Sequence, residues 1–147
     1  MIHIYTIIKN SDEPYSYVFE DDINMIEKIE LDEIIKYETI SPIFFYLGVC
    51  LINNDGIKNT NIEINNHSVM NVSYNCRGLH AIGISKIGVK DLLQFIKQSS
   101  FNYMDMILED FARQYPANIV RYDLESYIHQ HRGILFQDRN KFPSTIG

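Results

Sequence analysis

The closest pair of histidines in the sequence is His129-Gln130-His131. On a β-strand, residues two apart point to the same face, so both rings would project together, as two metal ligands or an acid and a base would. Cys50, Cys76 or an acid would complete a metal site, and Cys76 or a carboxylate would complete an acid–base site. The alternative is a pair of surface histidines beside Arg132. The first interpretation supports the hypothesis of a small enzyme that uses His129 or His131 as acid or base.

Other reactive groups lack the neighbours that their chemistry needs. The chain contains no P-loop, dinucleotide-binding or nucleophile-elbow motif. The stretch 83–88 holds two glycines and a lysine before an expected helix, which indicates a strand-to-helix turn or, alternatively, a weak anion site. Cys50 lies in an apolar run and is expected in the core. Cys76 is more exposed by pattern, but nothing nearby would lower its pKa. We therefore expect no catalytic residue, cofactor or metal ion.

Acidic residues gather at the amino end of the chain. The 147 residues carry a net charge of −6, and residues 1–40 hold ten acids against three lysines, while the rest of the chain is close to balance. This negative charge repels nucleic-acid phosphates and favours encounter with a basic partner, provided that the acids share one face. The alternative is a solvated surface that keeps the protein in solution. We expect no nucleic-acid partner.

Length and composition predict one soluble domain over residues 1–147. The chain is 46% hydrophobic and 22% charged, which is typical of a globular protein. Its longest apolar run, residues 43–52, is far shorter than the roughly 20 residues that cross a bilayer. The first residues lack the pattern of a secretory signal, and the two cysteines are not paired as CxxC. We therefore expect a cytoplasmic protein without a membrane partner.

The acidic region predicts two strands and then helix. Residues 2–8 and 15–19 have strand-like composition, and the turn-forming stretch 11–14 between them predicts an opening hairpin. Residues 22–38 favour a helix, but the apolar positions before and after Glu30 lie on opposite faces. A break near Glu30 resolves this conflict, giving two short helices; the alternative is one helix buried on two sides. Either arrangement would expose four acids: Glu27, Glu30, Asp32 and Glu33.

The middle of the chain predicts mostly strands. Residues 43–51 form a buried helix or a buried strand, which so short an apolar run cannot distinguish. Residues 60–64 and 70–76 alternate around Asn65-Asn66, which predicts a β-hairpin. Residues 79–84 predict a further strand.

The last third predicts two amphipathic helices. Apolar spacing predicts a helix over residues 86–98 and a second over 104–115, capped by Asn102 and ended by Pro116. The patterns of strand and helix conflict over residues 119–128, and residues 134–137 predict a last strand. Because strands and helices are mixed without a regular βαβ order, the sequence predicts an α+β fold, with a mainly antiparallel sheet packed against several helices.

In general character the chain resembles the immunity proteins of bacterial toxin–immunity pairs of the contact-dependent inhibition type. It is small, acidic, rich in isoleucine and asparagine, and without a catalytic motif. The resemblance implies a non-enzymatic cytoplasmic protein that binds a cognate toxin domain, such as a basic nuclease, and covers its active site or blocks its assembly. The partner-binding residues expected on this basis are seven acids and one aromatic anchor: Glu20, Asp21, Asp22, Glu27, Glu30, Asp32, Glu33 and Tyr37.

Two other interpretations stay open. The first is the small enzyme of unrecognised family that uses His129 or His131. The second is a viral or phage protein that binds a host factor; it makes the same electrostatic prediction and differs only in its partner. The oligomeric state is left open by the sequence.

Overall fold

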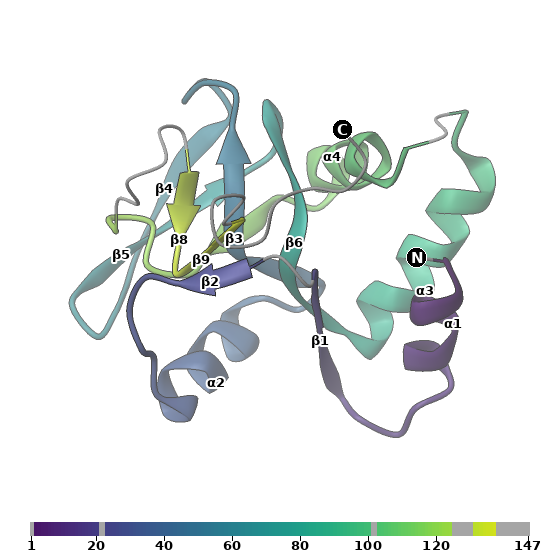
Figure 1. The fold of residues 1–147 in the computed structure, drawn as a ribbon, viewed down its shortest axis with the longest axis horizontal. Helices are drawn as coiled ribbons and strands as arrows, with labels where there is room; N and C mark the ends of the chain where they lie inside the picture. The colour runs from purple at the N-terminus through teal and green to yellow at the C-terminus, as the bar shows by residue number, and fades with distance from the viewer. Residues whose placement is uncertain (1, 21–22, 101–102, 125–130, 138–147) are drawn as a thin grey trace.

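The computed structural model describes residues 2–20, 23–100, 103–124 and 131–137, and for residues 2–4, 78–80 and 137 it describes the backbone alone. Figure 1 shows a twisted sheet with helices on both of its faces. The helices are α1 (Ile2–Lys9), α2 (Leu31–Ile40), α3 (Lys86–Gln98) and α4 (Met104–Gln114). The strands are β1 (Tyr15–Phe19), β2 (Ile23–Met25), β3 (Phe44–Leu51), β4 (Ile57–Ile64), β5 (His67–Val72), β6 (Cys76–Ser85), β7 (Ala117–Ile119), β8 (His131–Gly133) and β9 (Leu135–Gln137).

The sheet is mainly antiparallel, as the sequence predicts for an α+β fold. Its strands follow the order β1-β6-β3-β7-β5-β4, with β8 paired to β3, and β2 and β9 form a separate two-stranded ribbon. Among the described strands, β3 and β7 form the one parallel pair. β1 and β4 are therefore the two edges of the sheet.

The strand β3 divides the core into two parts because its side chains alternate between the faces of the sheet. Phe44 and Tyr46 pack with residues of α1, α3 and α4. Phe45 and Leu47 point the other way and pack with residues of α2, β5 and the segment between β8 and β9. Both faces of β3 are buried, which explains why its sequence is a continuous apolar run and resolves the helix-or-strand alternative in favour of a strand.

The elements with the clearest periodicity are confirmed. Helix α3 spans the predicted residues 86–98, and the side chain of Ser85 caps it by accepting a hydrogen bond from the Gly88 amide. Helix α4 covers most of the predicted second helix. The hairpin of β4 and β5 turns at Asn65 and Asn66, whose φ angles of 49° and 68° suit asparagine better than most residues. The predicted cap Asn102 lies outside the described residues.

The predicted opening hairpin is wrong. Residues 2–9 form helix α1, and β1 pairs instead with β6. Tyr5 and Ile8 are three residues apart, so a helix places them on one face, and both join the core beside α3. This packing outweighs the strand preference of the β-branched isoleucines.

The prediction for residues 22–38 is partly wrong. A break does occur before Leu31, but the first half contains the short strand β2 rather than a helix. β2 pairs with β9, with Ile23 opposite Gln137, and this partner at the far end of the chain leaves no local signal. Asp21 and Asp22, which begin this region, lie outside the described residues.

The prediction that Cys76 is exposed is also wrong. Cys76 begins β6, which lies between β1 and β3, and its side chain is fully buried in the core. Cys50, expected in the core, is partly exposed instead. In the described part of the chain, no helix is long and apolar enough to cross a membrane.

Candidate functional site

The structure divides the predicted partner-binding residues between the surface and the core. Glu27, Glu30 and Asp32 are exposed as predicted, and Glu20 is partly exposed at the end of β1. Asp21 and Asp22 lie outside the described residues. The prediction that Glu33 is exposed is wrong, because Glu33 is only 2% exposed. Tyr37, expected as an aromatic anchor, is 0% exposed, so neither residue lies at the surface.

Helix geometry explains why Glu33 and Tyr37 are buried. They are four residues apart and share the face of α2 that also carries Ile34 and packs against the sheet. The exposed positions of α2 lie on the opposite side. The exposure prediction for Glu33 failed because it followed the type of residue and not its position on the helix.

Arg121 neutralises the buried carboxylate. Its Nε and Nη2 atoms donate to the two oxygens of Glu33 at 2.7 and 2.8 Å, and its Nη1 donates to Glu27 at 2.7 Å. The backbone N–H of Arg121 donates to the Tyr37 hydroxyl at 3.1 Å. A fork-shaped guanidinium between two carboxylates is a strong, geometrically defined arrangement. These contacts join α2 to the turn that follows β7.

The ion pair shifts the pKa of both partners toward the charged forms. Hydrogen bonds from Arg121 are the largest cause that lowers the pKa of Glu33; burial opposes the shift, and a hydrogen bond from Asn65 adds to it. The same contact with Glu33 raises the pKa of Arg121. Burial raises the pKa of Tyr37. Glu33 is therefore a buried carboxylate held ionised by its partner, and it is not available to a second molecule.

A contact between a histidine and a carboxylate lies close to this ion pair. Nδ1 of His67 is 2.8 and 2.9 Å from the two carboxylate oxygens of Asp123, and His67 also helps to lower the pKa of Glu33. His67 begins β5, directly after the Asn65-Asn66 turn that contacts α2. We interpret this cluster of Glu27, Glu33, Arg121, His67 and Asp123 as a structural network that fixes α2 against the β4–β5 hairpin.

This network was not predicted from the sequence. Its partners lie far apart in the chain, with Glu33 and Arg121 separated by 88 positions. One local signal was present: Glu33 stands beside Ile34 and four residues before Tyr37, on the apolar side of its helix. A carboxylate there requires a cation, and Arg121 directly follows the buried residues Ile119 and Val120.

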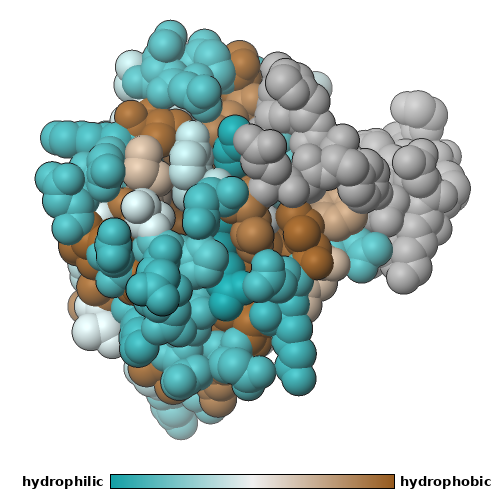
Figure 2. Space-filling model, turned by 90° about the vertical axis from the view of Figure 1, so that its left-hand side faces the viewer, coloured by the Kyte–Doolittle hydropathy of each residue, from teal (hydrophilic) through white to brown (hydrophobic). Residues whose placement is uncertain are grey.

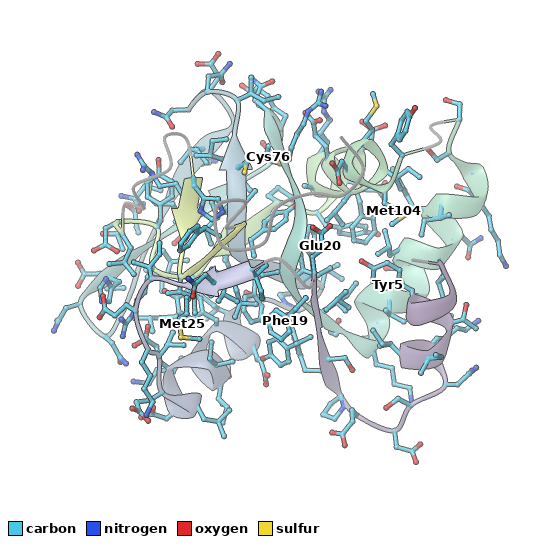
Figure 3. The ribbon with its side chains drawn as sticks, in the orientation of Figure 1. Tyr5, Phe19, Glu20, Met25, Cys76 and Met104 are labelled. Carbon is cyan, nitrogen blue, oxygen red and sulfur yellow. The ribbon has the colours of Figure 1, made fainter. Side chains whose placement is uncertain are left out.

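The exposed side of α2 carries apolar residues. The side chains of Leu31 and Ile35 are 73% and 49% exposed and lie one turn apart. Glu38, on the same side of α2, accepts a hydrogen bond from the Tyr17 hydroxyl of β1, and the Tyr17 ring stacks on Phe19 with 6.3 Å between ring centres. Phe19 is 50% exposed. Figure 3 shows Phe19 between β1 and α2.

We name these residues the α2–β1 face: Tyr17, Phe19, Leu31, Ile35 and Glu38. Glu30 and Asp32 flank Leu31 in the chain and are exposed. Figure 2 views the molecule from the side of β4, β5 and the start of α2, where hydrophobic side chains are exposed among mostly hydrophilic ones. An apolar surface bordered by carboxylates is suited to binding a protein partner.

The groups considered for catalysis lie in unfavourable surroundings. His131 is buried in β8, with its ring nearly perpendicular to that of Phe136, and His129 lies outside the described residues. Burial is the main cause that raises the pKa of the Cys76 thiol to about 11, so this thiol is protonated at neutral pH. Within the described ranges, no group of three or more potential ligands could hold a metal ion.

The two glycines of the 83–88 stretch allow neighbouring atoms to approach the backbone closely. A side chain at Gly83 would meet the rings of Tyr17 and Phe45, and one at Gly88 would lie 2.2 Å from the carbonyl oxygen of Ile43. The Ser85 side chain already accepts a hydrogen bond from the Gly88 amide. Of the two alternatives, a strand-to-helix turn and an anion site, the structure therefore favours the turn.

Comparison with protein-family models gives no match for this chain, and comparison with curated protein sequences gives none either.

Proposed function

We propose that this protein is a non-enzymatic binding protein, an immunity protein that neutralises a cognate toxin domain in the cytoplasm. The observation that supports the proposal is the α2–β1 face, where large apolar side chains are exposed beside carboxylate side chains. Exposed aromatic and aliphatic residues provide the affinity of a protein interface, and bordering charges speed the encounter with a basic partner.

The exposed side chains support a different set of residues for the proposed interaction. Leu31, Ile35 and Phe19 are the contact residues, with Glu30 and Asp32 as the charged border. Glu33 and Tyr37 support the surface from within, because their contacts with Arg121 hold α2 in position. Glu27 is exposed but shares its charge with Arg121. The partner-binding set expected from the sequence is thus reduced to the residues that a partner could reach.

The experiment that tests this function is capture of a partner from the source cell with the full-length protein as bait. We expect a basic protein domain that is toxic when expressed alone and harmless when co-expressed with this chain. The product of the neighbouring gene is the first to test. A captured partner without toxicity, or a toxic partner that this chain does not neutralise, would overturn the proposal.

A further inference from the structure

The two edges of the main sheet differ in how they are protected. The edge strand β4 has a break in register between Asn59 and Ile62, and Asn61 within it has a φ of 62°. Lys58 and Glu63 are exposed on the same strand. Bulges and charged side chains of this kind prevent a further strand from pairing with an edge.

The other edge strand, β1, has none of these features. Its sequence is Tyr-Ser-Tyr-Val-Phe, without charge, proline or glycine, and its pairing with β6 is regular along its whole length. Among the described strands, β6 is the one that pairs with β1. An uncharged, regular edge is the kind that accepts an additional strand.

The hydrogen bonds of β6 show which groups of β1 point outward. The amide of Ser85 donates to Ile43, on the β3 side, whereas the amide of Lys86 donates to Pro14, on the β1 side. Since successive residues of a strand turn their backbone groups to opposite sides, Ser16 and Val18 face β6. The N–H and C=O groups of Tyr15, Tyr17 and Phe19 consequently face away from the sheet.

The charges next to β1 indicate what kind of strand fits. Asp12 and Glu13 precede the strand, and Glu20 follows it. In an antiparallel pair of two copies, Glu20 of each strand would lie toward Asp12 and Glu13 of the other, and like charges across a pair are unfavourable. A strand with basic ends meets opposite charges at both ends of β1.

We infer that β1 is a strand-addition site for an extended segment of a partner protein, uncharged in its middle and basic at both ends. This inference rests on the proposed function for the identity of the partner and adds the way in which it binds. Backbone hydrogen bonds to Tyr15, Tyr17 and Phe19 hold the segment. Its alternate side chains lie beside Tyr17 and Phe19, continuing the α2–β1 face.

The probe for this site is the capped peptide Lys-Thr-Val-Thr-Val-Thr-Lys, added to the full-length protein at about 1 mM, a concentration suited to weak binding. Amide hydrogen exchange followed by NMR measures protection. We expect slower exchange at Tyr15, Tyr17 and Phe19, and binding about tenfold weaker at low salt for the same peptide with glutamate ends. Unchanged exchange at these three amides, or equal binding of both peptides, would overturn the site.

A backbone control separates strand pairing from side-chain contact. Peptides N-methylated at alternate residues, one set for each edge of the peptide, are added to the unmodified protein. Strand addition predicts that one methylated set loses binding while the other retains it, because one edge of an added strand faces β1. Equal binding of both sets would contradict strand addition, and this test does not depend on the folding of a variant.

In the protein itself, Tyr17→Pro removes an outward N–H without removing a hydrogen bond to β6, and Tyr17→Ala removes the same ring but keeps the N–H. We expect the proline variant to bind the peptide about tenfold more weakly than the alanine variant, on the basis of one lost backbone bond. Equal binding would count against the site. A toxin that binds both variants equally would leave the proposed function standing and refute strand addition. If the peptide binds at β1 but capture yields no toxin, strand addition would stand and the proposed function would be refuted.

Discussion

Arg121 has a φ of 48°, in the left-handed region that few residues other than glycine occupy. A conformation of this kind costs of order 1–3 kcal/mol and persists when its surroundings determine it. Here the backbone N–H of Arg121 contacts Tyr37, and its side chain contacts Glu27 and Glu33. These contacts therefore offset the cost of the left-handed backbone at Arg121, and they neutralise the buried carboxylate of Glu33.

Removal of Arg121 should destabilise the fold strongly. Arg121→Met would leave Glu33 buried without a cation, and we expect the free energy of unfolding to fall by about 3 kcal/mol. The measurement is urea denaturation at neutral pH. Arg113→Met is the matched control, because Arg113 is exposed and its ion pairs are 3.9 Å long; we expect a change below about 0.5 kcal/mol. Equal effects of the two substitutions would contradict a structural role for the network.

The lowered pKa of Glu33 predicts a specific dependence of stability on pH. Its ion pair stabilises the folded state fully above the unfolded-chain pKa of about 4.3, and this contribution is lost as the pH falls toward the lower folded-state value. The difference in unfolding free energy between the natural protein and Glu33→Gln should therefore shrink below about pH 4.3.

The measurement is urea denaturation of both proteins between neutral and acidic pH, with the exposed Glu63→Gln as control. We expect the control to differ little from the natural protein at every pH. A Glu33→Gln difference that stayed constant down to low pH would contradict the pKa shift.

Cys76 should be unreactive in the folded protein. Burial raises the pKa of its thiol to about 11, and its side chain is inaccessible. We expect iodoacetamide at mildly alkaline pH to modify Cys76 only after the chain is unfolded, as measured by peptide mass spectrometry. Rapid modification of Cys76 in the native protein would show that its surroundings differ from those described.

At the scale of elements, the sequence predicts best where the stabilising contacts repeat locally. The stripes of α3 and α4 and the Asn65-Asn66 turn are short-range patterns, and all three were predicted. Helix α1 and strand β2 were not, since each is determined by a partner distant in the chain: α3 for α1 and β9 for β2. The same limit applies to the site, where exposure of Glu30 and Asp32 was predicted but the Glu33–Arg121 pair was not.

The exposed side of α2 should matter for binding and little for stability. Leu31→Ser with Ile35→Ser removes apolar area that is mostly in contact with water, so we expect unfolding free energy to change by less than about 1 kcal/mol. Affinity for the captured partner should fall about 100-fold if these residues are central contacts.

Ile87→Ser is the matched control, because Ile87 is 66% exposed on α3, which packs on the opposite face of the sheet from α2. Isothermal titration calorimetry with the captured partner measures both variants. An equal loss of affinity in the two would show that the α2–β1 face is not the contact surface.

At the scale of the whole molecule, folding redistributes the acidic charge of the first forty residues. Arg121 comes from the other end of the chain and neutralises Glu33 while sharing the charge of Glu27. Asp12 and Glu13 lie between α1 and β1, and Glu30 and Asp32 lie at the start of α2. The negative charge is therefore more dispersed than the sequence alone indicates. At the start of α2, Glu30 and Asp32 provide most of it.

The most direct test of binding through this surface is the association rate with the captured partner as a function of salt concentration. For Glu30→Lys with Asp32→Lys, we predict association about tenfold slower at low salt, with a weaker dependence on salt than the natural protein has. The control pair Asp55→Lys with Asp105→Lys makes the same change in net charge at exposed positions of the β3–β4 turn and of α4, away from α2, and should retain most of the natural rate. Equal rates for the two pairs at low salt would contradict a partner that docks at the start of α2.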